Sequence, residues 1–551
     1  MTRNNTPDAP PTRLVLLLPL LIAAAALFLA VEEEPYHIDE LRQTRSYSMP
    51  ITEVIERSFA QDQPPLDAVL NAVLQRAIGI GDWQQRALSV VFALTGLYMF
   101  GLLLYGAGFG WGTFFGMLVL ATSPLLVSVF AYARPYALPF CLTAGFVLVT
   151  NQWLSKRNRW LIPIMFAVAV LLPLSRTIEP NLVLGATVAV MLFFRFTGRH
   201  QRFEGSIWAP VAASALGILA VGMPVMLHLR AQLTGYTESG LIPSSGQVRR
   251  LVTDLPDLLA QSLPLWPAVV VLLGVALILP GSRGLLIHNW WVWVLAILPV
   301  GFISLFLLTT SPEQPLFERY LFTWIPLLGV LVGSLFSKRE PQLIWLLGVV
   351  AGGTILISSL VTLGYDVGTR ERGDWSLLSE AITDQVPSDW IVVHEHLGPI
   401  DAYRTPFAGR PRYLPNDWVT PRISDLVENA DVIAGDQHFA IVIATDETGQ
   451  RSPQGPFEVS GWDRVEVDGF FSLYLPETDL RGPIAMARSF LLFADSMSDS
   501  PSGYMLELSA ASLLAENGEF VEACDVWLTR LAEVEPVASF AKETEMWTDS
   551  C

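Results

Sequence analysis

The chain has 551 residues, of which 52% are hydrophobic and only 16% are charged, and its formal net charge is −18. Soluble domains usually carry about one quarter charged residues, so this composition excludes an ordinary soluble protein and indicates a membrane protein. We expect the membrane as a partner and no nucleic acid.

The first apolar span covers residues 14–31, and Glu32, Glu33 and Glu34 follow it directly. Because no small-residue cleavage signature is present, we expect this span to be retained as an anchor. Nine further segments lack charged residues, and each is long enough for a spanning helix of about 20 residues. The first of the nine can hold two helices, so eleven spans are predicted. The nine are 87–133, 135–155, 160–175, 180–194, 205–229, 258–282, 284–312, 320–337 and 341–365.

Positive charge gathers in alternate loops, which predicts the orientation of the chain. Basic residues lie near the N-terminus, at 156–159, at 195–202, at 283 and at 338–339. Since cytoplasmic loops are enriched in lysine and arginine, these loops and the N-terminus are predicted to be cytoplasmic. The intervening loops and the C-terminal domain would then lie outside. We expect a multi-pass protein of the cytoplasmic (inner) membrane of a bacterium.

The first outward loop is predicted to be a structured platform. Apolar residues recur at helical spacing from 51 to 59, and Pro64-Pro65 ends that helix. Residues 66–77 then predict a second helix with one apolar and one polar face, lying in the membrane interface. Its polar face carries Asp67, Asn71 and Gln75. Farther along, 230–257 predicts a mobile loop with a short interfacial helix, suited to a lid or to binding the acceptor.

From residue 366 onward the composition is that of a soluble domain. Alternating or apolar runs at 390–395, 439–444 and 464–475 predict strands with helices between them, and the tail after Ala487 is helical. Residues 518–523 resemble one helix of a tetratricopeptide repeat. We therefore predict an all-α polytopic membrane domain (1–365), an extracytoplasmic α/β domain (366–485) and a helical tail with one such helix pair (486–551). Cys524 and Cys551 could pair outside the cell.

Several short motifs lie at the outer ends of these spans. Asp39-Glu40 follows the first span, Asp62 precedes Pro64-Pro65-Leu66, and further motifs open or end later spans. These later motifs are Arg86 with Ser89, Ser123-Pro124, Arg134-Pro135-Tyr136 and Arg319-Tyr320. In this order they resemble the GT-C superfamily of membrane glycosyltransferases, closest to the branch of protein O-mannosyltransferases and the lipid A aminoarabinose transferase. The resemblance covers about residues 14–361.

The resemblance implies inverting transfer of a hexose or pentose from a polyprenyl-phosphate-linked sugar to an acceptor hydroxyl of a lipid, glycan or protein. The family's carboxylate motif falls on Asp39, which would be the catalytic base, and Asp62 would orient the acceptor or sugar. Arg134 and Arg319 would bind the departing phosphate, since guanidinium groups bind phosphate bidentately. The remaining predicted substrate-binding residues are Glu40, His37, Tyr136, Tyr320 and Arg86.

The chain departs from the family pattern at two positions. Tyr132 stands where many relatives carry a glutamate two residues before the fourth-span arginine, and Gln63 replaces the lysine that precedes Pro-Pro in the aminoarabinose branch. The first change removes a carboxylate that could hold a metal, and the second removes a cation that could touch phosphate. We therefore expect no cofactor, with a divalent metal as the alternative.

Structural interpretations stand beside the catalytic ones. Arg134 could extend from a span end toward the headgroups, Arg319 could pair with Glu318, and Arg86 could fix the platform helix. Arg176 and Glu179, three residues apart, suggest a structural pair. The tryptophans at 290, 291 and 293 suggest a membrane-interface belt, and His394 and His396 a surface pair on a strand.

Two other functions compete with glycosyl transfer. A transporter or flippase would place ionisable residues at mid-membrane and show repeated halves with broken helices. A sensor or assembly protein would use the C-terminal domain and leave the outward motifs without a role.

Overall fold

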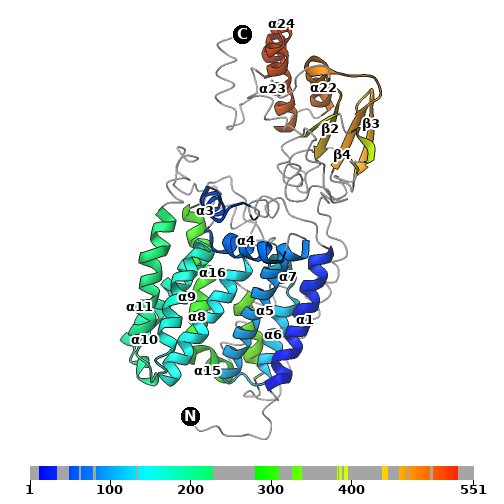
Figure 1. The fold of residues 1–551 in the computed structure, drawn as a ribbon. Coiled ribbons are helices and arrows are strands. Elements are labelled where there is room, and N and C mark those ends of the chain that lie inside the picture. Colours follow the sequence, from blue (N-terminus) through cyan, green and yellow to red (C-terminus); the bar gives the residue numbers. More distant parts are fainter. Residues whose placement is uncertain are drawn as a thin grey trace. The chain divides into compact units, whose positions relative to one another are not determined.

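A computed structural model of the chain shows a helical bundle and a smaller domain with a sheet (Figure 1). The structure describes residues 12–33, 47, 49–60, 64–78, 82–131, 135–227, 280–309, 325–337, 381–382, 384–387, 390–394, 437–444, 458–467, 471–496 and 501–531. Two compact units are present. The described helices up to residue 337 belong to the first, and the described strands and helices from residue 381 belong to the second.

The first unit is helical throughout its described length. Its helices are α1 (Thr12–Glu33), α3 (Ile51–Ala60), α4 (Leu66–Ile78), α5 (Asp82–Gly106), α6 (Gly112–Thr122), α7 (Pro124–Ala131), α8 (Ala137–Lys156), α9 (Leu161–Ser175), α10 (Ile178–Phe196), α11 (Trp208–Gly217), α15 (Pro280–His288), α16 (Trp290–Thr309) and α17 (Ile325–Leu335). A short 3-10 helix, η1, covers Arg199–Arg202, and a π-helical turn, η2 (Ile218–Gly222), continues α11.

Several of these helices are suited to crossing a bilayer. Within the described residues, four helices are long and apolar enough to span it, and up to six spans result if each of two bent helix pairs counts as one. The chain is therefore a multi-pass membrane protein. Three shorter apolar helices, within α1, α9 and α17, add to the bundle. The predicted spans at 258–282 and 341–365 fall largely or wholly outside the described residues, as does the predicted loop at 230–257.

The break between α6 and α7 bends the chain by 58° at Ser123. Proline disfavours helical backbone in the residue before it, and Ser123 is accordingly extended, with φ −66° and ψ 116°. Pro124 then occupies the first position of α7, where its missing N–H costs nothing. The Ser123 hydroxyl accepts a hydrogen bond from the Leu126 N–H at 3.4 Å and so caps α7. The Ser123-Pro124 motif is thus a helix break.

Helices α6 and α17 are joined by two glycine pairs. Gly112 and Gly116 on α6 are four residues apart, as are Gly329 and Gly333 on α17. A Cβ atom on Gly116 would lie 2.5 Å from the Gly329 carbonyl oxygen, and one on Gly333 would lie 2.7 Å from the Gly112 carbonyl oxygen. The two backbones therefore touch directly. Such small-residue contacts drive helix association in lipid, where no hydrophobic effect acts between helices.

Gly116→Ala tests this contact. The added methyl group would overlap the α17 backbone, so we expect a loss of about 1–3 kcal/mol of stability and a lower unfolding temperature. Exposure of the buried Cys141 thiol to a fluorogenic maleimide during heating reports the transition. Gly185→Ala is the matched control, because the space beside Gly185 is open. Equal unfolding temperatures for the two variants would contradict the assigned contact.

Helix α4 lies across one end of the bundle (Figure 1) and packs against α3, α5 and α9. Its extent agrees with the helix predicted at 66–77. Its polar face is turned inward: Asp67, Asn71 and Gln75 are buried, whereas Val73 and Ile78 are half exposed. An ordinary interfacial helix presents its polar face to water. In α4 that face meets protein instead.

The tryptophans at the start of α16 are not an interface belt. Trp290 and Trp291 are only 1% and 0% exposed, so the expectation of a belt at the membrane surface is wrong for these two residues. The chain bends by 84° between α15 and α16, immediately before Trp290. This bend turns both indoles into the bundle core, where Trp291 meets Phe100 edge to face at 6.3 Å.

The second unit contains a four-stranded mixed sheet in the order β1-β2-β4-β3. Its strands are β1 (Ile391–His394), β2 (Phe439–Ala444), β3 (Trp462–Val467) and β4 (Phe471–Pro476). β1 pairs with β2 in parallel, and the other two pairings are antiparallel. The three predicted strand segments coincide with these strands, although the run at 464–475 is a hairpin of two strands.

The described part of the second unit also contains three helices and a π-helical turn: α22 (Gly482–Ser496), α23 (Pro501–Glu516), α24 (Phe520–Val526) and η5 (Trp527–Leu531). α22 packs against α23, and α23 packs against α24. Phe490 and Phe493 of α22 share one hydrophobic core with Phe439 and Trp462 of the sheet. Sheet and helices therefore form a single folding unit. Cys524 on α24 is disulfide-bonded; Cys551, the expected partner, lies outside the described residues.

Candidate functional site

Two of the nine predicted site residues, Tyr136 and Arg86, lie within the described part of the chain. The others fall outside it, so their roles stay predictions: Asp39, Asp62, Glu40, His37, Arg134, Arg319 and Tyr320. Both described residues lie at the same end of the bundle, because Arg86 belongs to the first turns of α5 and Tyr136 directly precedes α8.

Tyr136 belongs to a compact polar group with Arg176 and Glu179. The Arg176 guanidinium carbon lies 4.2 Å from the centre of the Tyr136 ring, and Arg176 Nη1 lies 2.9 Å from Glu179 Oε1. The predicted pairing of Arg176 with Glu179 is thereby confirmed. The ring stacked against the guanidinium adds cation–π attraction, which holds Arg176 between an aromatic face and a carboxylate.

The chain between α9 and α10 explains why these groups meet. α9 ends at Ser175, and Arg176 takes an extended conformation with φ −164° and ψ 156°. α10 begins at Ile178, so Glu179 lies in its first turn, where the positive end of the helix dipole favours a carboxylate. The short turn projects both side chains toward the start of α8.

Burial makes this polar group unusual for a span end. The Glu179 and Arg176 side chains are only 8% and 16% exposed. Neither Glu179 carboxylate oxygen accepts a hydrogen bond from the described residues. A buried carboxylate needs a paired charge and hydrogen bonds to offset desolvation. Arg176 supplies the charge, and the carboxylate keeps hydrogen-bonding capacity that a ligand can use.

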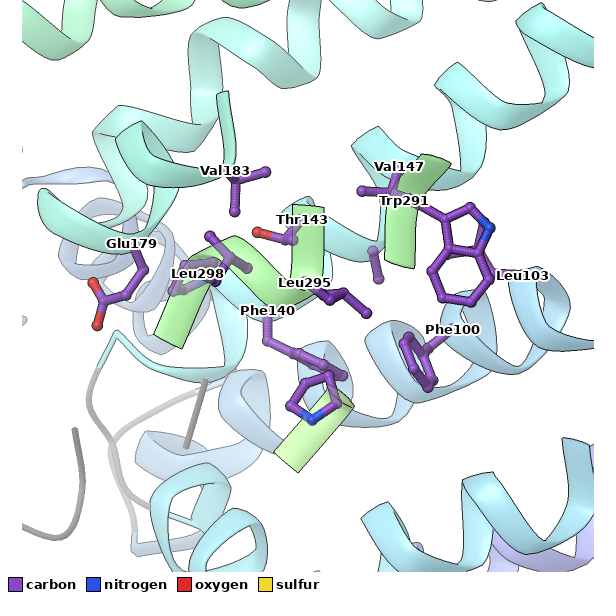
Figure 2. A pocket seen from close by; sticks show the side chains of 13 residues that line it. Phe100, Leu103, Phe140, Thr143, Val147, Glu179, Val183, Trp291, Leu295 and Leu298 are labelled. Atoms are coloured by element: carbon purple, nitrogen blue, oxygen red, sulfur yellow. The ribbon is translucent and has the colours of Figure 1, made fainter. Parts of the chain in front are cut away.

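A cavity of about 60 Å³ begins beside Glu179 and runs between α5, α8, α10, α16 and α17. Figure 2 shows Glu179 at one end of the lining side chains and Trp291 toward the other. Among the thirteen lining residues, Glu179 carries the single charge, and Thr143 and Trp291 are the other polar side chains. The remaining lining residues are apolar. The cavity lining is therefore apolar except at the end formed by Glu179.

Arg86 has a structural contact in addition to its predicted role. Its side chain is fully buried, and Nη1 donates a hydrogen bond to the Val31 carbonyl oxygen at 3.0 Å. Val31 lies in the last turn of α1, whose free carbonyls and negative dipole end favour a cation. Arg86 thus fixes the end of α1 from which the Asp39 loop departs. Direct contact with substrate stays a prediction.

No group of three or more His, Cys, Asp or Glu side chains suited to holding a metal ion occurs in the described ranges. His394 ends β1, while Glu395 and His396 lie outside those ranges. The expected absence of a metal stays a prediction.

The second unit has its own polar cluster at the sheet edge. Asp479 accepts hydrogen bonds from Arg481 at 2.8 Å and lies 2.6 Å from His438 Nε2, and Trp390 stacks on the His438 ring. The Arg481 hydrogen bonds, followed by that of His438, hold the pKa of Asp479 below its ordinary value. Because Asp479 is shared by both neighbours, the cluster ties β2 to the start of α22.

Comparisons with known proteins give a structural likeness. No family model matches the chain, and no curated protein matches its sequence. A similar solved structure is that of ArnT from Cupriavidus metallidurans bound to undecaprenyl phosphate. It has a TM-score of 0.45 and 12% sequence identity, and the match covers 84% of this chain and 97% of that chain.

The Arg176–Glu179 pair can be tested by a double-mutant cycle. Arg176→Gln and Glu179→Gln each leave a buried charge without its partner, so each should lower stability by about 1–3 kcal/mol. The double variant leaves no such charge and should lose less than the sum of the two single losses. Thermal exposure of the Cys141 thiol measures all three variants. Strictly additive losses would show that the pair contributes no coupling.

Proposed function

We propose that the chain is a glycosyltransferase that moves a sugar from a polyprenyl phosphate to an acceptor hydroxyl at the outer face of the cytoplasmic membrane. The observation that carries this proposal is the joining of Arg176, Tyr136 and Glu179 to the end of an apolar cavity within a membrane bundle. A lipid with a polar headgroup and an apolar tail matches that division between polar and apolar surface.

The sequence motifs extend the same site. Arg134 precedes Tyr136 by two residues in the chain, and Tyr136 contacts Arg176. Arg134 and Arg319 would bind the phosphate through paired N–H donors, which stabilise the charge that develops as the sugar leaves. Arg176 is engaged with Glu179, so we assign it to shaping the headgroup site.

The proposed reaction is a single displacement. The acceptor oxygen attacks the anomeric carbon while the bond from that carbon to the phosphate oxygen breaks, and polyprenyl phosphate departs with the bonding electrons. Asp39 takes the proton of the acceptor hydroxyl. Since phosphate is a good leaving group, no general acid is needed, and the anomeric configuration inverts. Asp62 would orient the acceptor or the sugar.

Asp39→Asn tests the base. Removing the proton acceptor should lower sugar transfer from a labelled polyprenyl-phosphate sugar by at least about 100-fold while the protein stays folded and inserted. The assay follows label entering acceptor in membranes that contain the variant. Glu53→Gln is the matched control, because it removes an exposed carboxylate from α3, in the same outward loop.

Full activity of Asp39→Asn would remove the assigned base. Movement of a solute into vesicles with no donor consumed would instead support the transporter alternative. Identification of the labelled product would also decide between protein, lipid and glycan acceptors.

We further propose that the second unit lies outside the cytoplasm. Disulfides persist in oxidising compartments, and Cys524 is disulfide-bonded. In intact spheroplasts, a membrane-impermeant reductant followed by a membrane-impermeant maleimide should label Cys524, as detected by mass spectrometry of its peptide. The buried Cys141 should stay unlabelled. Labelling of Cys524 only after the membrane is permeabilised would place this unit in the cytoplasm.

A further inference from the structure

We infer that the buried polar face of α4 binds the hydroxyl groups of the donor sugar. The residues concerned are Asp67, Asn71 and Gln75, called the α4 polar row below. The inference rests on the proposed function and extends it, since it names the surface that would distinguish a sugar-bearing lipid from the bare polyprenyl phosphate.

The α4 polar row follows the helix at intervals of four residues, so its members lie on one face about 6 Å apart along the axis. Asn71 and Gln75 are 1% and 4% exposed. The Asn71 Nδ2 group donates to the Asp67 carboxylate at 3.2 Å and to the Asp67 carbonyl at 3.1 Å. This internal bonding orients the Asn71 amide and leaves its oxygen facing away from Asp67.

Two polar atoms of the row keep unused capacity. Asn71 Oδ1 accepts no hydrogen bond, and Gln75 Nε2 donates none, within the described part of the chain. Buried polar groups in native proteins are nearly always hydrogen-bonded, because desolvation without a partner is costly. An unused acceptor and an unused donor on one helix face suit sugar hydroxyls, since each hydroxyl both donates and accepts.

The helix face chosen for burial argues against a purely structural role. α4 also has an apolar face. If that face were buried, Asn71 and Gln75 would point to water and would keep their hydration. Instead Val73 is half exposed while the polar row meets protein. The adjacent buried residues Ala68 and Ala72 pack with Val54 of α3, so the apolar contacts of α4 lie beside the row.

Position links the row to the headgroup site. α4 begins immediately after the Pro64-Pro65 turn that follows Asp62 in the sequence. It packs against α9, which ends one residue before Arg176. A lipid headgroup beside Arg176 and Tyr136 would therefore present its sugar toward the end of the bundle that α4 covers (Figure 1).

The test uses purified full-length protein with undecaprenyl phosphate and with a set of undecaprenyl phosphates that carry glucose, mannose, galactose or arabinose. Heating with a maleimide dye measures ligand stabilisation through the Cys141 thiol. We expect at least one sugar-bearing lipid to raise the unfolding temperature more than the bare lipid does. The Asn71→Leu/Gln75→Leu variant should lose this difference, with affinity for that lipid falling on the order of tenfold.

The same variant should respond normally to bare undecaprenyl phosphate. Its stability without ligand should fall by about 1–3 kcal/mol, because Asn71→Leu also removes the hydrogen bond to the buried Asp67 carboxylate. Gln75→Met is a second variant that conserves side-chain volume. The matched control is Thr113→Val. It removes a buried hydroxyl that has no hydrogen-bond partner in the described residues and that belongs to α6, next in sequence to Gly112 of the glycine contact. It should keep the sugar-dependent difference.

The inference is overturned if no sugar-bearing lipid stabilises wild type beyond the bare lipid, or if the α4 variants keep that extra stabilisation. A protein that responds to neither kind of lipid would overturn the proposed function as well. The two failures are therefore distinguishable in one experiment.

Discussion

A bilayer cannot hydrate polar groups, and this constraint governs how the bundle is built. Within lipid, helices gain nothing from burying apolar surface against one another, so the bundle depends on close backbone contact. The glycine pairs of α6 and α17 provide such contact, and their carbonyl oxygens lie where any side chain would collide. With apolar helices held this closely, a buried polar side chain costs free energy unless it is paired, capped or bound to a ligand.

The polar side chains described below, at the α4 end of the bundle, are stabilised in different ways. Arg86 donates a hydrogen bond to a carbonyl in the last turn of α1. Arg176 lies between Tyr136 and Glu179, so its charge is compensated on two sides. Glu179, Asn71 and Gln75 keep hydrogen-bonding capacity after their contacts with other described residues are counted.

The sequence predicted much of this arrangement because the positions of charged residues and the lengths of apolar segments can be read directly from it. Charge-free stretches located the described spans, the loop after α1 was expected to hold two helices, and Arg176 was expected to meet Glu179 at three-residue spacing. Ser123-Pro124 was visible as a motif, but its role as a helix break depends on the backbone at Ser123. The cavity was not predicted because residues from five helices line it. The hydrophobic periodicity of one helix does not show how it packs against the others.

Composition and spacing by themselves determined that the chain is a membrane protein, which segments are apolar and which helices have two unlike faces. Tertiary structure alone decided what each face meets. Periodicity distinguishes the polar side of α4 from its apolar side but cannot say whether water, lipid or protein covers either, and here protein covers the polar side. Likewise, three tryptophans near a span end suggest an interface belt until the 84° bend before Trp290 turns two of them inward. The orientation of a helix depends on its neighbours, and those neighbours are distant in the chain.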